Sequence, residues 1–130
     1  MAREIKFRGK KFCQDEWIYG SLITRGERGA DGNFIDTGRG KCYPLQQDTI
    51  GQFTGLHDKN GKEIYEGDIV RTLVSRLNAT KNKKYRNFVI RYDAPHFWNG
   101  YDPMLMGPMY MEVIGNIYDN PELLKQEDEV

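Results

Sequence analysis

Glycine and proline interrupt this chain so often that they limit its fold more than any other feature. Fourteen Gly and five Pro occur in 130 residues. Both residues interrupt helices and mark turns, so this spacing favours short strands over long helices. Seven to nine short strands and one terminal helix are expected, with no internal repeat and no low-complexity linker. The sequence therefore predicts a mainly β protein.

The expected strands can be placed from alternation and from β-branched and aromatic content. They cover residues 3–8, 17–23, 34–37, 41–45, 48–56, 69–74, 87–92 and 109–118. In the first, Ile5 and Phe7 alternate with charged residues, which predicts a half-buried strand that forms a hairpin with the second. Pro44 should lie at a sheet edge or strand end because it has no N–H. Loops are expected at 25–33, 75–84 and 93–108.

The segment after residue 56 carries the clearest turn signals. Asn60-Gly61 predicts a type I′ hairpin turn, in which both central residues have positive φ. Gly67 is expected to supply a second positive φ. Asp68 should accept backbone N–H bonds at this turn, and Ile64 and Tyr65 should enter the core. At the C-terminus, Asn120-Pro121-Glu122 predicts the start of a short helix with Asn120 as its N-cap.

Composition and charge exclude several classes of protein. The 19 basic and 19 acidic residues cancel and 12% of residues are aromatic, whereas disordered chains have few aromatics and a large net charge. No apolar run approaches the ~20 residues of a membrane span, and the charged N-terminus is unlike a signal peptide. Cys13 and Cys42 show no metal-type spacing and are expected to be free thiols in a reducing, cytoplasmic compartment.

Residues 50–70, from Ile50-Gly51-Gln52 to Asp68-Ile69-Val70, resemble the YopX family of phage and prophage proteins. Residues 3–10, 17–22 and 112–124 are similar to further segments of that family, in the same order. The resemblance covers nearly the whole chain.

The resemblance implies a fold class and a source, and it implies no catalytic residues. The fold is mainly β: an N-terminal β subdomain, residues 1–50, followed by an SH3-like small barrel with a short C-terminal helix, residues 51–130. It also implies a gene of temperate phages or mobile elements, and hence a protein of the bacterial host cytoplasm.

A basic segment between Arg71 and Tyr92 is the sharpest local charge feature, with seven basic residues and no acid. It predicts a possible nucleic-acid contact through Arg76, Lys81, Lys83, Lys84, Tyr85 and Arg86, because cations neutralise phosphates and exposed rings stack on bases. The other interpretation is a solvated loop, which the zero net charge favours.

Residues 95–109 combine three aromatic rings with three Met, fixed by Pro. Such segments form adaptable contact surfaces or fold over a core. The candidate partner-binding residues are Phe97, Trp98, Tyr101 and Met104.

Catalytic chemistry has little support in the sequence. His57 and Asp58 are adjacent, so in a strand their side chains point to opposite faces, and His96 is a weaker candidate. Nucleophile-elbow, phosphate-loop and two-His metal motifs are missing. We therefore expect a non-enzymatic accessory protein without cofactor or metal. It would act by contact with a host or phage protein and with copies of itself, and nucleic-acid binding through residues 71–91 is the alternative.

Overall fold

The computed structural model describes residues 4–25, 32–73, 85–93, 96–98 and 110–125. The chain divides into two compact units, Met1–Gly55 and Leu56–Val130, which are described separately. The described chain is mainly antiparallel β structure, as predicted.

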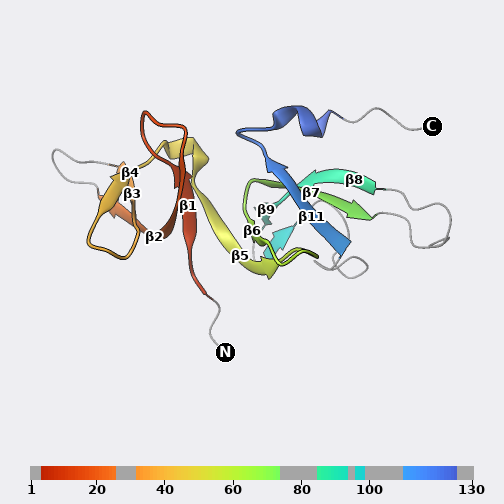
Figure 1. The fold of residues 1–130 in the computed structure, drawn as a ribbon, viewed down its shortest axis with the longest axis horizontal. Helices are drawn as coiled ribbons and strands as arrows, with labels where there is room; N and C mark the ends of the chain where they lie inside the picture. Colours follow the sequence, from red (N-terminus) through yellow and green to blue (C-terminus); the bar gives the residue numbers. More distant parts are fainter. Residues whose placement is uncertain (1–3, 26–31, 74–84, 94–95, 99–109, 126–130) are drawn as a thin grey trace. The chain divides into compact units, whose positions relative to one another are not determined.

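The first unit is built on an antiparallel sheet (Figure 1). Its strands, in the order in which they lie side by side, are β4 (Cys42–Pro44), β3 (Gly32–Asp36), β2 (Trp17–Arg25), β1 (Phe7–Lys10) and the first part of β5 (Gly51–His57). The predicted hairpin is present as β1 and β2, with Phe7 opposite Gly20 and Lys10 opposite Trp17. Pro44 ends the outermost strand, as predicted.

One face of this sheet carries the core of the first unit. Ile18, Ile35 and Leu45 are buried there, and four partly buried residues pack against them: Phe7, Leu22, Tyr43 and Ile50. A single 3-10 turn, η1 (Gln47–Thr49), connects β4 to β5. The Thr49 hydroxyl accepts the Lys10 backbone N–H at 2.9 Å, which fixes this turn against β1.

The prediction for the first strand is wrong in detail. Ile5 is 68% exposed, whereas Arg8 and Lys10 are only 6% and 8% exposed. The strand begins at Phe7, and the cationic groups of its two charged residues lie near the Trp17 ring. The Arg8 guanidinium lies 4.6 Å and the Lys10 ammonium 5.5 Å from the Trp17 ring centroid. Cation–π attraction therefore lets charged side chains occupy a buried face.

The second unit contains a three-stranded sheet and a hairpin (Figure 1). The sheet has the order β11 (Met111–Asn116), β7 (Asp68–Leu73) and β8 (Tyr85–Val89). The hairpin pairs β9 (Arg91–Asp93) with β10 (His96–Trp98), so part of the predicted loop at 93–108 is a strand. Short strand β6 (Glu63–Tyr65) follows β5. The core contains Ile64, Val70, Ile90 and Met111, with Phe88 and Val113 packed against it.

The SH3-like barrel is not confirmed, because the described strands form open sheets. The predicted C-terminal helix is reduced to one 3-10 turn, η3 (Pro121–Leu124). The Asn120 side chain does not cap it; its Oδ1 accepts the Asn116 N–H at 3.3 Å instead. No helix within the described residues is long and apolar enough to span a membrane.

The turn at Asn60-Gly61 joins β5 to β6 but is not of type I′. Gly61 has φ +83°, and Cys13 is the only described residue other than glycine with positive φ. The Gly61 N–H donates to the Asp58 carbonyl at 3.0 Å, and the Asp58 N–H donates to the Lys62 carbonyl at 2.8 Å. This pattern is a three-residue hairpin loop, in which a type I turn precedes one left-handed glycine.

Candidate functional site

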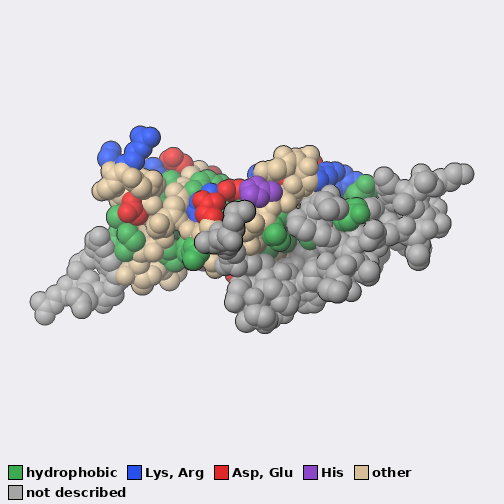
Figure 2. All heavy atoms as spheres, turned by 90° about the horizontal axis from the view of Figure 1, so that it is seen from below, with side chains coloured by type: hydrophobic (Ala, Val, Ile, Leu, Met, Phe, Trp, Pro, Cys, Tyr) green, Lys and Arg blue, Asp and Glu red, His purple; other side chains and the backbone are tan. Residues whose placement is uncertain are grey.

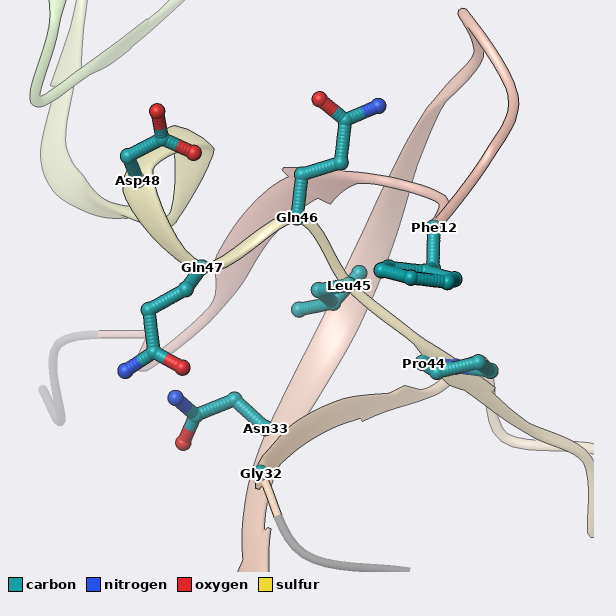
Figure 3. A pocket seen from close by; sticks show the side chains of 8 residues that line it. All are labelled: Phe12, Gly32, Asn33, Pro44, Leu45, Gln46, Gln47 and Asp48. Carbon is teal, nitrogen blue, oxygen red and sulfur yellow. The ribbon is translucent and has the colours of Figure 1, made fainter.

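A concave surface formed by described residues lies at the end of β4 in the first unit (Figure 3). Two adjoining hollows share Phe12 and Pro44, and we call them together the Phe12 groove. The larger encloses about 540 Å³ and the smaller about 250 Å³. The larger is lined by Phe12, Gly32, Asn33, Pro44, Leu45, Gln46, Gln47 and Asp48, and the smaller by Lys11, Phe12, Gln14, Tyr43 and Pro44.

Phe12 lies in the turn between β1 and β2, and hydrogen bonds hold this turn against β4. The Phe12 N–H donates to the Pro44 carbonyl at 2.9 Å. The Gln46 side-chain amide donates to the carbonyls of Lys11 and Gln14, at 3.0 and 3.1 Å. The Phe12 side chain is nevertheless 61% exposed. A backbone fixed in this way presents a large apolar ring to solvent.

The rim of the larger hollow is polar. Asn33 Oδ1 accepts a hydrogen bond from Thr24 Oγ1 at 2.7 Å, which orients the amide. Gln47 and Asp48 are exposed in η1. In Figure 3 the Gln47 and Asn33 amides point toward one another, on the opposite side of the hollow from Phe12. The rim therefore offers amide donors and acceptors, and the Asp48 carboxylate lies beyond them on η1.

The smaller hollow has a cation at its edge. The Lys11 ammonium lies 4.4 Å from the Tyr43 ring centroid and 3.3 Å from Glu16 Oε1. Its charge is thus balanced locally. Asp48 takes part in none of the ion pairs found among the described residues. Asp48 is also the one charged residue among the described residues that line the larger hollow.

The predicted nucleic-acid residues are only partly described. Tyr85 and Arg86 lie in edge strand β8, and Arg76, Lys81, Lys83 and Lys84 lie outside the described residues. Tyr85 is 39% exposed, and the Arg71 guanidinium lies 4.4 Å from its ring centroid.

Acidic charge accompanies this basic surface. Glu112 lies opposite Arg71 in the sheet register, and its carboxylate is 3.8 Å from the Lys59 ammonium. On the face drawn in Figure 2, red acidic and blue basic side chains of described residues are interspersed.

Of the four predicted partner-binding residues, the structure describes only the backbone of Phe97 and Trp98. Phe97 and Trp98 belong to β10, whose backbone pairs with β9. Their side chains, and the residues Tyr101 and Met104, lie outside the described part of the chain.

Asp58 supports the backbone of the second unit through its carboxylate. Its carboxylate is 6% exposed and accepts three backbone N–H bonds: from Asn60 at 2.8 Å, Lys62 at 2.9 Å and Val113 at 2.8 Å. Burial raises the pKa of this carboxyl. The three N–H bonds and the nearby Lys62 charge lower it more, so that the pKa lies below its ordinary value of 3.8. Asp58 is therefore ionised at neutral pH and joins the β5–β6 turn to β11.

Other chemistry finds little geometric support in the described residues. His57 ends β5, beside the Asp58 turn, and the His96 side chain is not described. Among the described residues, no group of three or more His, Cys, Asp or Glu is placed to hold a metal ion. Both cysteines are exposed free thiols.

Sequence reasoning missed the Phe12 groove. A phenylalanine within the polar run Lys10-Lys11-Phe12-Cys13-Gln14 is the one signal that could have indicated it, because an aromatic residue in a turn has no strand partner to bury it. The lining residues come from three separate segments, which only the fold brings together.

Comparison with known proteins identifies the family of the chain but names no activity for it. The model of the YopX protein family matches residues 6–125. The crystal structure of protein EF1440 from Enterococcus faecalis is similar, with a TM-score of 0.56 and 25% sequence identity over 95% of this chain and 100% of that chain. A search of the curated proteins finds no match. With nearly all of its length covered by the family model, the chain belongs to the YopX family.

Proposed function

We propose that this protein is a non-enzymatic accessory protein of phage or prophage origin that acts by protein–protein contact in the host cytoplasm. The Phe12 groove is the observation that carries the proposal. Large apolar side chains held at the surface beside a hollow are typical of interaction sites. Phe12 meets both conditions, since the residue is 61% exposed and lines a hollow with a volume of about 540 Å³.

The energetics favour contact through this residue. A buried aromatic ring removes roughly 150–250 Å² from water, at about 25 cal/mol per Å² of apolar surface. Aromatic residues at the centre of an interface often dominate its affinity. Phe12 is well suited to this role because hydrogen bonds already fix its backbone, so little ordering cost remains on binding.

Photo-crosslinking tests the proposal. A benzoylphenylalanine at position 12, made in the bacterial host, should give a discrete protein adduct on irradiation. The same group at Ile5, which is exposed in the same unit but does not line the groove, is the control. Excess wild-type protein should suppress the adduct and the Phe12→Ala protein should not. Equal labelling from both positions would contradict the proposal.

A homo-oligomer remains part of the proposal, since edge strands in small β units can pair between copies. Light scattering over a range of concentrations measures it. A discrete dimer or larger species supports self-association, and a monomer at all concentrations limits the contact to a different partner.

Nucleic-acid binding is the second candidate, and the Arg71–Tyr85 pair favours it. An exposed ring next to a guanidinium is a stacking surface for a base. Arg86 follows Tyr85 in β8 and adds a positive charge on the other face of the strand. Binding of single-stranded DNA should then weaken steeply with salt. Replacing Lys81, Lys83, Lys84 and Arg86 by Ala should flatten the log–log salt slope. A slope unchanged by these substitutions would count against this candidate.

A further inference from the structure

We propose that the Phe12 groove binds an extended, proline-containing segment of a partner protein, with a basic residue of that segment placed at Asp48. This inference rests on the proposed contact function and specifies its ligand. It follows from three features of the groove: the blocked strand edge, the paired hollows and the uncompensated carboxylate.

The first feature is that the sheet edge beside the groove does not accept another strand. β4 is the outermost strand, but Pro44 has no N–H to donate. The Pro44 carbonyl is already used by the Phe12 N–H at 2.9 Å, and Lys11 forms a bridge with Leu45. A ligand at this place is therefore recognised through side chains and not by extending the sheet.

The second feature is that two hollows with mostly apolar linings share Phe12 and Pro44. A polyproline II segment has three residues per turn and repeats about every 9 Å, with no internal hydrogen bonds. It presents apolar side chains at regular intervals to aromatic-lined grooves without needing a free strand edge. One such side chain would enter each hollow, against Tyr43 in the smaller and Leu45 in the larger.

The amides at the rim match the same kind of ligand. A polyproline II backbone leaves its carbonyls unpaired, and so it offers acceptors to amide donors. In Figure 3 the amides of Gln47 and Asn33 lie together at one side of the larger hollow. They are placed to donate to ligand carbonyls while Phe12 and Leu45 contact its side chains.

The third feature sets the direction of the ligand. Lys11 is balanced by Glu16 at 3.3 Å, whereas Asp48 forms none of the ion pairs found among the described residues. Charge complementarity therefore favours a ligand with a Lys or Arg at the Asp48 end of the groove. At the Lys11 end it favours no charged residue of the ligand. A second copy of this chain and a ligand without proline are the competing occupants.

Fluorescence anisotropy with synthetic peptides tests the inference. The probes are two labelled peptides of three Leu-Pro-Pro repeats, one with an Arg at its N-terminus and the other with an Arg at its C-terminus. In one control peptide Ala replaces the Arg, and in a second control peptide Ala replaces every proline. Wild-type protein should bind one of the two Arg-ended peptides more tightly than the other. It should bind the proline-free peptide at least about tenfold more weakly than the matching proline peptide, because the bound conformation is no longer preformed.

Three variants assign the binding to the groove. Phe12→Ala should weaken binding about tenfold or more, as for a central aromatic contact, and Phe12→Leu should recover part of it. Asp48→Asn should remove the preference for Arg, about two- to fivefold for an exposed ion pair, and leave the Ala-ended peptide unaffected. Ile5→Ala should change nothing. Thermal melting checks that each variant is folded.

Several outcomes would overturn the inference. They are no binding of the proline peptides, equal binding of the proline-free peptide, or binding that Phe12→Ala does not change. If a crosslink from position 12 to another protein persists in any of these cases, the contact function stands and only the ligand is wrong. A crosslink only to a second copy of this chain would replace the partner segment by self-association.

Discussion

At the scale of single residues, Asp58 is the clearest case of a side chain that supports the backbone. Replacing it by Asn would remove a charged acceptor from three backbone N–H groups. Hydrogen bonds to charged groups contribute roughly 1.5–3 kcal/mol, so Asp58→Asn should lower the free energy of unfolding by about 2–3 kcal/mol. Urea denaturation measures this, with Asp48→Asn as a control that should cost less than about 1 kcal/mol, because Asp48 is exposed and forms none of the ion pairs found among the described residues.

The ionisation of Asp58 also predicts how the free energy of unfolding depends on pH. Because the pKa of Asp58 is lower in the folded chain than its ordinary value, its contribution is fully present above the unfolded pKa of about 3.9. It is lost as the pH falls through the lower, folded value. The difference in stability between wild type and Asp58→Asn should therefore be constant from about pH 5 to 7 and shrink below about pH 4. A difference that grows on acidification would contradict the assigned role.

Gly67 allows a second test at this scale. It has φ +92°, and a Cβ there would lie 3.2 Å from Tyr118 Cε2, whereas Gly61 has φ +83° and nothing within 4 Å of its Cβ position. Both substitutions to Ala cost about 1–2 kcal/mol for the left-handed backbone, and Gly67→Ala should cost more because Tyr118 must shift. Equal losses in urea denaturation would show that the Tyr118 contact does not matter.

Predictions at the residue scale succeeded where the determinants are local. Gly67 has the predicted positive φ, and Asp68 accepts the Tyr65 N–H at 2.7 Å as predicted. At Asn60-Gly61 the predicted hairpin is present and Gly61 has positive φ, but the turn type was wrong. The Asp58 carboxylate binds the Asn60 and Lys62 N–H groups and stabilises a type I turn instead. The burial of Arg8 was missed because alternation shows polarity and not the Trp17 ring that covers its guanidinium.

At the scale of elements, the Gln46 side chain connects the turn between β1 and β2 to the chain that follows β4. Gln46 donates to the carbonyls of Lys11 and Gln14 and so holds the backbone around Phe12. Gln46→Ala should speed amide hydrogen exchange in residues 11–16 at least about tenfold, as expected for a lower opening free energy. Exchange in β7 should not change. Uniform acceleration through the first unit would mean that Gln46 supports the sheet as a whole.

Most strands could be placed from the sequence because alternation and turn residues act over a few positions. Closure of a barrel could not, because it depends on which distant edges pair, and here β11, β7 and β8 form an open sheet. The terminal helix was overestimated for a related reason. Pro121 starts a helical turn, but the Asn120 side chain is engaged with Asn116 and leaves that turn uncapped.

At the scale of the whole molecule, equal numbers of acidic and basic residues argue against a general affinity for nucleic acid, and protein–protein contact is the function that we propose first. The Phe12 groove joins residues 11–14, 32–33 and 43–48, so no single segment of sequence could have predicted it. The family match extends over residues 6–125 and places the chain among YopX proteins.

The most direct test of the contact function compares two photo-reactive positions in the same cells, Phe12 in the groove and Tyr85 on the basic strand. We expect irradiation to yield a discrete protein adduct from position 12 and no nucleic-acid adduct above background from position 85. A nucleic-acid adduct at position 85, with no protein adduct at position 12, would contradict the account and make the basic strand the functional site.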